Sequence, residues 1–365
     1  MKILVVSNTK LGDLPPLRNL IESLIKSGYE VVLISPGADA IRNSRVKSIT
    51  INLVNRKSFF CVLDYFSHRA RLRKLVTTEM KNCDFLWTAT DKTVRELGKV
   101  VFRYKHIMQL QELIEDVPLF PGQEVFKCHI KKYALRAYKV VVPEFNRAQI
   151  QKAWWGLDDL PVVLPNKVDI SNIEFSNENN EIIQELENEK RKIILYQGAI
   201  GKDRDLESFA RAVSLMKDQY VFCVMGRVTD DGGLEELVRK YPNIKIIPYI
   251  DSPNHLRVTR KAYIGILPYK PEKVAHLSIL NAVFCAPNKI FEFAAYGIPM
   301  IGTNVSGISI PFKQYKMGVI IDDDSTNGIK AAIEHIDDNY EAMSESCIRF
   351  YNDCDYDEMV RTVLK

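Results

Sequence analysis

The sequence lacks the segments that carry a chain into or across a membrane. No run of about eighteen apolar residues is present, which is the length that a transmembrane helix needs. The start, MKILVVS, passes directly into a strand-like pattern and has no signal-peptide core. We therefore expect a protein that stays in the cytoplasm. Its 365 residues, of which 46% are hydrophobic and 26% charged, suit two globular domains.

The sequence also lacks motifs for metal binding, disulfide frameworks and dinucleotide binding. The seven cysteines are odd in number and form no CxxC pair, so they indicate neither a zinc site nor a disulfide framework, and most should be small core residues. No GxGxxG follows the first apolar run, which argues against dehydrogenase chemistry. Residues 322–324 are three successive aspartates, but Ser325 after them favours a helix start over a metal site. We expect no metal and no cofactor. The cysteines are at positions 61, 83, 128, 223, 285, 347 and 354.

Charge is distributed unevenly along the chain. Residues 1–165 contain 26 Lys and Arg against 16 Asp and Glu, a net charge of +10, whereas the remainder carries −6. A basic amino-terminal half suggests an anionic partner, either an acceptor that bears phosphate or a membrane surface. No recognised nucleic-acid-binding motif accompanies this charge, so we expect no nucleic acid partner.

Residues 59–75 place aromatic side chains before a basic cluster. A helix of this composition could rest on an anionic bilayer, and the protein would then be peripheral on the inner face of the cell membrane. The alternative is a helix that packs in the core and has a solvated basic end. The aromatic residues are Phe59, Phe60, Tyr65 and Phe66, and the basic ones are His68, Arg69, Arg71, Arg73 and Lys74.

Apolar runs alternate with helical patterns over most of the chain, which is typical of an α/β protein with parallel sheets. The alternation starts with a strand, a helix and a second strand, and it restarts after a polar stretch at 171–191. Two such arrays predict two Rossmann-like domains, at 1–165 and 166–345, followed by a helical segment at 346–365. Helices are expected at 15–26 and 204–216, and strands at 2–7, 29–35, 84–88, 106–110, 139–142, 193–197, 220–225, 243–247, 262–267 and 318–321.

One segment, CAPNKIFEFAAYGIPMIGTNVSG at 285–307, combines structural and chemical signals. Pro287 and Asn288 predict a helix start with Asn as the cap, and Gly297 predicts a helix end that uses a positive φ. The N-terminus of this helix would offer N–H groups and partial positive charge to a phosphate. Lys289 and Glu292 lie in its first turn, where Glu292 could accept hydrogen bonds from a sugar diol. The alternative is an exposed Lys289–Glu292 pair on an ordinary surface helix.

This segment resembles the donor-site sequence of B-type glycosyltransferases, in the large group related to bacterial sucrose- and mannosyl-transferring enzymes. The family reads Pro-Asn-Lys-Leu-x-Glu-Tyr-hydrophobic-Ala-x-Gly-x-Pro-Val-Ile, and the match is nearly residue for residue. The resemblance implies two domains that face each other across a cleft, with a carboxyl-terminal helix that crosses back onto the first. It also implies that Glu292 binds the nucleotide ribose. The chain departs from the family at Phe284, where other members have a further carboxylate. PVVLPNKVD at 161–169 resembles the family's Val-Ile-Pro-Asn-Gly-Val-Asp at the passage between domains.

The resemblance assigns further donor contacts in the second half. Gly198, at a strand end, would let the backbone approach the ligand, and Arg204, at a helix start, would meet the diphosphate together with Lys289. A merely solvated Arg204 is the alternative. Contacts to the base and the diphosphate are also implied for Gly226, Arg227, Tyr249 and Ile250.

In the first half, the resemblance implies that Gly12 lies near the reaction centre, and a plain turn glycine is the alternative. The cluster that begins at Gln111 follows the strand at 106–110, and ligands of open α/β sheets gather beyond the carboxyl ends of strands. Glu112 is the candidate for a catalytic or acceptor-orienting group, or else it is an ordinary capping carboxylate. Gln111 stands where the family often has His.

These features together predict a metal-independent glycosyltransferase. Its donor would be a nucleotide sugar, UDP-linked in our interpretation, and its acceptor a lipid-linked or growing glycan of a bacterial surface polysaccharide. Arg204, Lys289 and the helix N-terminus would stabilise the charge that grows on the departing diphosphate. One alternative is a non-hydrolysing sugar-nucleotide epimerase, which shares the fold. Another is a non-catalytic subunit that binds nucleotide or a partner enzyme, which the replacements Phe284 and Gln111 suggest.

Overall fold

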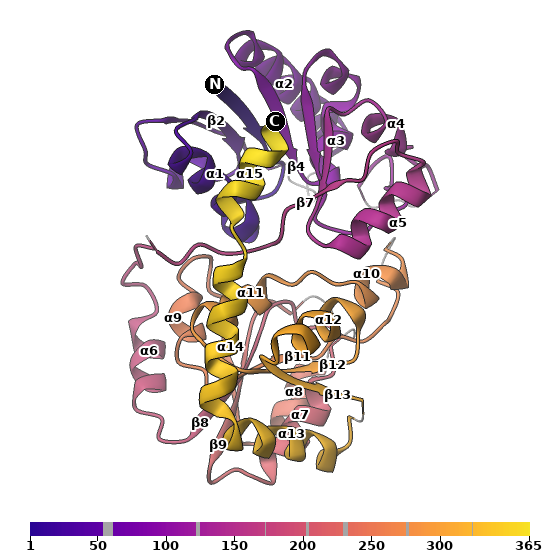
Figure 1. Cartoon of the computed structure of the whole chain (residues 1–365). Coiled ribbons are helices and arrows are strands. Elements are labelled where there is room, and N and C mark those ends of the chain that lie inside the picture. The colour runs from indigo at the N-terminus through magenta and orange to yellow at the C-terminus, as the bar shows by residue number, and fades with distance from the viewer. Residues whose placement is uncertain are drawn as a thin grey trace. The chain divides into compact units, whose positions relative to one another are not determined.

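The chain is seen here in a computed structural model that describes residues 1–53, 61–121, 125–171, 173–201, 204–228, 233–274, 277–322 and 324–365 (Figure 1). It divides into two compact units. The amino-terminal unit comprises Met1–Pro165, Ala275–Asn281 and Asp355–Lys365, and the carboxyl-side unit comprises Asn166–Val274 and Ala282–Cys354. Both chain termini therefore belong to the first unit.

The described part of the amino-terminal unit contains a parallel sheet of seven strands. The strands are β1 Lys2–Val6, β2 Glu30–Ser35, β3 Val46–Thr50, β4 Phe85–Ala89, β5 His106–Gln109, β6 Lys139–Val142 and β7 Val162–Val163, in the order β3-β2-β1-β4-β5-β6-β7. Alternate side chains of β1 enter different clusters, since Ile3 and Val5 pack on one face of the sheet and Leu4 and Val6 on the other. Both faces are therefore buried, which explains the continuous apolar run in the sequence.

Helices cover this sheet, and the last one comes from the far end of the chain. The carboxyl-terminal helix α15 packs on α1, where its Val360 and Val363 join the cluster of Leu17 and Leu20. This return of the chain confirms the predicted crossing helix. The helices of the unit are α1 Pro15–Lys26, α2 Cys61–Glu79, α3 Asp91–Leu97, α4 Lys131–Ala134, α5 Phe145–Trp155 and α15 Tyr356–Leu364, with 3-10 turns η1 Leu11–Asp13, η2 Ala38–Ala40, η3 Met80–Asn82 and η4 Gly98–Arg103.

The carboxyl-side unit repeats the design with a parallel sheet of six strands among its described residues. These are β8 Lys192–Gln197, β9 Tyr220–Met225, β10 Ile244–Ile247, β11 Ile264–Leu267, β12 Met300–Thr303 and β13 Gly318–Ile321, in the order β10-β9-β8-β11-β12-β13. Along β8, Ile193 and Leu195 face one cluster and Ile194 and Tyr196 face the other. The helices are α6 Asn180–Glu187, α7 Leu206–Ser214, α8 Leu234–Lys240, α9 Leu256–Thr259, α11 Asn288–Ala295, α12 Ser306–Tyr315, α13 Thr326–Asp338 and α14 Tyr340–Asp353, and α10 Ile279–Val283 lies at the boundary between the units.

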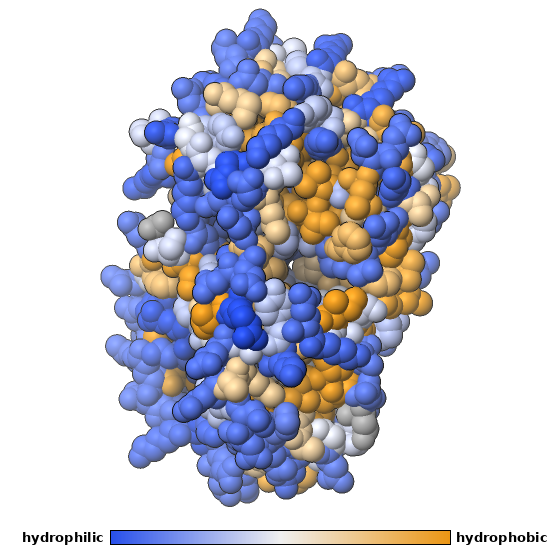
Figure 2. Space-filling model, viewed as in Figure 1, coloured by the Kyte–Doolittle hydropathy of each residue, from blue (hydrophilic) through white to orange (hydrophobic). Residues whose placement is uncertain are grey.

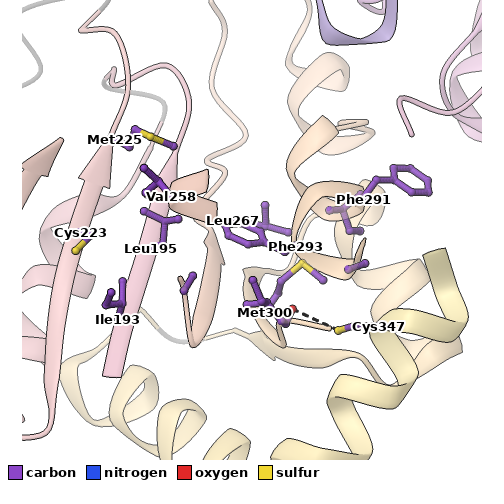
Figure 3. Packing of buried hydrophobic residues seen from close by; sticks show 14 of the residues in the cluster. Ile193, Leu195, Cys223, Met225, Val258, Leu267, Phe291, Phe293, Met300 and Cys347 are labelled. Carbon is purple, nitrogen blue, oxygen red and sulfur yellow. Dashed lines mark hydrogen bonds between the residues drawn. The ribbon is translucent and has the colours of Figure 1, made fainter. Parts of the chain in front are cut away.

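The helix α11 is fixed by a close-packed core (Figure 3). The ring of Phe293 is fully buried, and a Cβ on Gly265 of β11 would lie only 2.5 Å from that ring, so glycine makes room for it. On the other side, α14 packs against α11, and the Cys347 thiol beside Met300 donates to the carbonyls of Ile298 and Met317. The position of α11 is thus held by tertiary packing.

Several sequence predictions need correction. The segment that returns to the amino-terminal unit begins at Asp355 rather than at 346, because α14 continues to Asp353 and packs on α11. Residues 275–281 also belong to the amino-terminal unit. The strand β3 was missed because VKSIT lacks an apolar run, and α12 was missed because it contains Pro311.

The predicted role of cysteine is confirmed for the side chains that the structure describes. Cys128, Cys223, Cys285 and Cys347 are buried free thiols, whereas Cys83 and Cys354 are half-buried. None of the helices in the described ranges is long and apolar enough to span a bilayer.

Replacing Phe293 with alanine should lower the free energy of unfolding by about 3–5 kcal/mol, since a fully buried ring leaves a cavity. Phe145→Ala is the control, because Phe145 is an exposed ring at the start of α5. Urea unfolding followed by far-UV circular dichroism measures both. Equal losses in the two variants would contradict the packing described for α11.

Candidate functional site

Two cations from distant positions in the sequence meet at one aromatic ring in the carboxyl-side unit. The Nζ of Lys289, in the first turn of α11, lies 5.2 Å from the centre of the Tyr269 ring, and the Cζ of Arg204 lies 4.0 Å from the same centre. The ammonium also lies 4.7 Å from the ring of Tyr196. Arg204 reaches this position because its backbone pairs with Tyr269 in an antiparallel bridge just before α7. The interpretation of Arg204 as merely solvated is therefore wrong.

Two glycines form the backbone floor beside the ammonium group. Gly198 and Gly226 directly follow β8 and β9, and a Cβ on Gly198 would lie 2.6 Å from Cε and 2.8 Å from Nζ of Lys289. A Cβ on Gly226 would overlap the carbonyl oxygen of Gly198. Gly198 also has a φ of +130°, which L side chains rarely adopt. The predicted close approach of backbone at Gly198 is consistent with this arrangement.

Glu292 is buried, and each of its two carboxylate oxygens has a partner. Its side chain is only 4% exposed, its Oε2 accepts from Nε2 of Gln197 at 2.6 Å, and its Oε1 lies 3.2 Å from Nε2 of His255. Thr259 completes the group by donating from Oγ1 to Oε1 of Gln197 at 2.7 Å. A buried carboxylate requires such partners. The alternative of an exposed Lys289–Glu292 pair is therefore wrong.

The start of α11 differs in one detail from the prediction. Pro287 occupies the N-cap position with extended backbone (φ −72°, ψ 135°), and Asn288 is the first helical residue, so Asn288 is not the cap. No side-chain hydrogen bond caps this end. The helix end at Gly297 has the predicted positive φ, 64°.

The residues proposed for the nucleobase form a separate pair at the ends of β9 and β10. The Cζ of Arg227 lies 4.1 Å from the centre of the Tyr249 ring, and both residues are exposed. Ile250 next to Tyr249 is buried, so its side chain belongs to the core cluster and only its backbone remains for contact with a ligand.

In the amino-terminal unit, Glu112 lies in the loop after β5. Its side chain is 48% exposed, and its Oε2 lies 4.0 Å from Nη1 of the buried Arg147. That guanidinium donates to the carbonyls of Gln111 and Asn281 at 2.8 and 3.0 Å. No helix starts at Glu112 in the described residues around it, so the interpretation as a capping carboxylate is wrong. Gly12 lies in the 3-10 turn η1 after β1.

Sequence reasoning missed a second carboxylate near Glu112. Asp91 is the first residue of α3 and is buried, and burial is the main cause that raises its pKa. The negative charge of Glu112 raises the pKa further, whereas Lys92 and Arg95 lower it. The residue before it, Thr90, has a φ of 97° that is unusual for threonine. The sequence signal was the position of Asp91 just after a strand.

Sequence reasoning also missed Gln197, His255 and Tyr196. Gln197 ends a strand next to a candidate glycine and was recoverable, whereas no pattern singles out His255. No group of three or more His, Cys, Asp or Glu side chains within the described ranges could hold a metal ion.

Two parallel α/β units with a returning terminal helix define the B-type glycosyltransferase fold, and comparisons agree. Residues 191–339, within the span of the carboxyl-side unit, match the family described as "Glycosyl transferases group 1". No curated protein sequence matches the chain significantly.

Solved structures share the fold over the whole chain at low sequence identity. A glycosyltransferase from Rickettsia africae is 16% identical with a TM-score of 0.64, covering 100% of this chain and 96% of that one. HepE from Anabaena in complex with UDP-glucose is 12% identical with a TM-score of 0.68, covering 100% and 98%. An E. coli structure described as "Trehalose-6-phosphate" bound with UDP-2-fluoro glucose is 11% identical with a TM-score of 0.68 and the same coverage.

Replacing Gly198 with alanine should displace the Lys289 ammonium and strain the backbone by about 1–3 kcal/mol. Gly233→Ala is a matched control, because Gly233 also has a positive φ, +67°, but a Cβ there meets nothing within 4 Å. Both variants should lose some stability in urea unfolding, but Gly198→Ala should lose more, because its Cβ would also meet the Lys289 side chain. Equal losses in the two variants would contradict the close approach of Lys289 to Gly198.

Proposed function

We propose that the chain is a glycosyltransferase whose carboxyl-side unit binds a nucleotide sugar. The observation that carries this proposal is the convergence of Lys289 and Arg204 on the Tyr269 ring beside the start of α11. Two cations and a helix N-terminus at one place favour a diphosphate, which accepts hydrogen bonds from all three. The match of residues 191–339 to "Glycosyl transferases group 1" supports the same proposal.

The ribose would bind at Glu292. An ionised carboxylate has about four lone-pair sites, so the bonds from Gln197 and His255 leave two for a ribose diol. Asn288 would contribute its helix-start N–H, and Gly226, Arg227, Tyr249 and the backbone of Ile250 would border the base and the diphosphate. UDP is our proposed nucleotide, because HepE and the E. coli protein are described with UDP-glucose and UDP-2-fluoro glucose.

In the proposed reaction, the bond between the anomeric carbon and the diphosphate oxygen breaks. A new bond forms from that carbon to an acceptor hydroxyl oxygen, whose proton is released. Lys289 and Arg204 would stabilise the negative charge on the departing diphosphate without a metal ion. Glu112 would orient the acceptor hydroxyl or receive its proton, and Gly12 would lie near the reaction centre.

The proposed acceptor is a lipid-linked or growing glycan of a bacterial surface polysaccharide. This part of the proposal comes from the sequence resemblance and from the net charge of +10 in residues 1–165, which suits an acceptor that bears phosphate. The enzyme would act in the cytoplasm, peripherally on the inner face of the cell membrane.

Binding of nucleotide tests the donor part directly. UDP at 100 times its dissociation constant should stabilise the protein by about 2.7 kcal/mol, seen as a raised melting temperature in a panel of nucleoside diphosphates. UMP should stabilise it less, because UMP lacks the second phosphate that Lys289 and Arg204 would hold. Equal shifts with UMP and UDP would contradict a diphosphate site.

Lys289→Ala should lower kcat by about a hundredfold or more, because a fixed charge on the leaving group is lost. Glu292→Gln should mainly weaken nucleotide binding, by about tenfold or more, since bonds to a charged acceptor contribute about 1.5–3 kcal/mol. Lys313→Ala, at an exposed lysine of α12, is the control. Release of UDP from UDP-sugar measures turnover. Full activity in both variants would refute the assignment.

Incubation of the protein with UDP-sugar alone separates the alternatives. NMR should show no change in the sugar configuration without an acceptor, whereas an epimerase would convert the donor. Release of nucleotide only when another protein is added would favour the non-catalytic subunit.

A further inference from the structure

Some side chains of the basic cluster on α2 bind other parts of the protein, and others are exposed. Arg69 donates from Nη2 to the carbonyl of Arg95 at 3.1 Å, and Arg73 donates from Nε to the carbonyl of Glu96 at 2.9 Å. His68 is buried, so for these three residues the core-packed interpretation holds. Arg71 and Lys74 are exposed. Phe59 and Phe60 lie outside the described residues.

The opposite end of the same helix exposes apolar side chains. Val62, Leu63 and Phe66 lie in its first turns, and Leu63 is 67% exposed. Leu63 and Lys74 are eleven residues apart, about three helical turns, so they share one side of α2. The exposed face of α2 therefore changes from apolar to basic along its length.

A second segment extends this apolar surface. Backbone pairing of Pro118 with Lys127, and of Leu119 with Phe126 at 2.7 Å, brings the two ends of the segment together. Its Phe120 ring contacts the ring of Phe66 at 5.9 Å between centres. Val125 and Phe126 are 83% and 63% exposed. The apolar patch is thus formed by Val62, Leu63, Phe66, Phe120, Val125 and Phe126.

Basic side chains flank the patch on both of its segments. Arg71 and Lys74 follow it along α2, and exposed lysines follow Phe126 on the other segment: Lys127, Lys131 and Lys132. The exposed acidic side chains nearest in the described sequence are Asp64 and Glu115, so the local balance is basic. Figure 2 shows a mostly hydrophilic face of the molecule on which apolar residues gather near α3 and α5 of the same unit.

We propose that the patch formed by the start of α2 and by residues 118–121 and 125–127 docks on an anionic lipid bilayer. Aromatic and aliphatic side chains would enter the interface, and the flanking lysines and arginines would meet lipid phosphates. The helix α2 follows β3 along the chain, and residues 118–121 follow β5 and the loop that carries Glu112. This inference rests on the proposed function in one respect only: docking would bring the enzyme to a lipid-linked acceptor in the membrane.

Vesicle sedimentation with the full chain tests this surface. The protein should sediment with phosphatidylcholine vesicles that contain phosphatidylglycerol, and at least tenfold less with phosphatidylcholine alone. Raising the salt from 0.1 M to 1 M should weaken binding, since the Debye length falls from about 10 Å to about 3 Å. Equal binding to the two vesicle types would overturn the proposal.

Single variants separate the apolar and basic contributions. Leu63→Ser should lower vesicle affinity about tenfold, whereas Leu215→Ser should leave it unchanged, because Leu215 is 69% exposed in the carboxyl-side unit. Arg71→Gln with Lys74→Gln should lower affinity about thirtyfold on anionic vesicles only, with Lys313→Gln as its control. Circular dichroism confirms folding of each variant.

The result can be read independently of catalysis. Leu63→Ser should bind UDP as tightly as the unaltered chain does. If the unaltered chain bound vesicles but did not bind UDP, the proposed function would be refuted and the docking surface would stand. If Leu63→Ser instead converted a dimer to a monomer in gel filtration without changing vesicle affinity, the patch would be a contact between two copies and the membrane proposal would be wrong.

Discussion

In a parallel sheet every strand ends at the same edge, and this constraint organises the carboxyl-side unit. The strands β9, β8 and β11 lie side by side in that order, although 28 to 70 residues separate their last residues in sequence. The loops that follow them bring Gly198, Gly226 and Tyr269 together, and Arg204 joins through its backbone bridge to Tyr269. The sheet topology therefore produces the positively charged site, and its two cations need not be close to each other in the sequence.

Two positive charges at one aromatic ring repel each other, so the site needs groups that stabilise them. The negative faces of the Tyr269 and Tyr196 rings attract the Lys289 ammonium, and the Tyr269 face also attracts the Arg204 guanidinium. Glu292 lies one turn along α11 from Lys289, but its bonds go to Gln197 and His255. Because the carboxylate is satisfied elsewhere, it does not occupy the cations that the proposed diphosphate would use.

The two units have similar parallel sheets but carry different proposed binding surfaces. The carboxyl-side unit gathers cations near buried tyrosines, whereas the amino-terminal unit exposes apolar side chains next to lysines and arginines. In the latter, Arg69 and Arg73 hold α2 against α3 through carbonyls at the end of α3. The same helix thus contributes to the core with one face and to the proposed membrane surface with the other.

Much of the fold could be predicted from sequence, because buried parallel strands are continuous apolar runs and helix ends carry local signals. The strand at 139–142 and the helix at 15–26 have the predicted bounds, and Ser325 caps α13 as expected. The strand β3 could not be predicted, since its residues are half-buried or exposed and its pairing with β2 is tertiary.

The candidate site divides in the same way. Local sequence determined the start of α11, the left-handed Gly297 and the positions of Lys289 and Glu292 in one turn. Only the tertiary structure decided that Lys289 and Arg204 both lie at the Tyr269 ring while Glu292 contacts Gln197 and His255. The reason is physical: helical periodicity fixes where two side chains lie along a helix, but the groups that meet them come from other strands, whose order the local sequence does not encode.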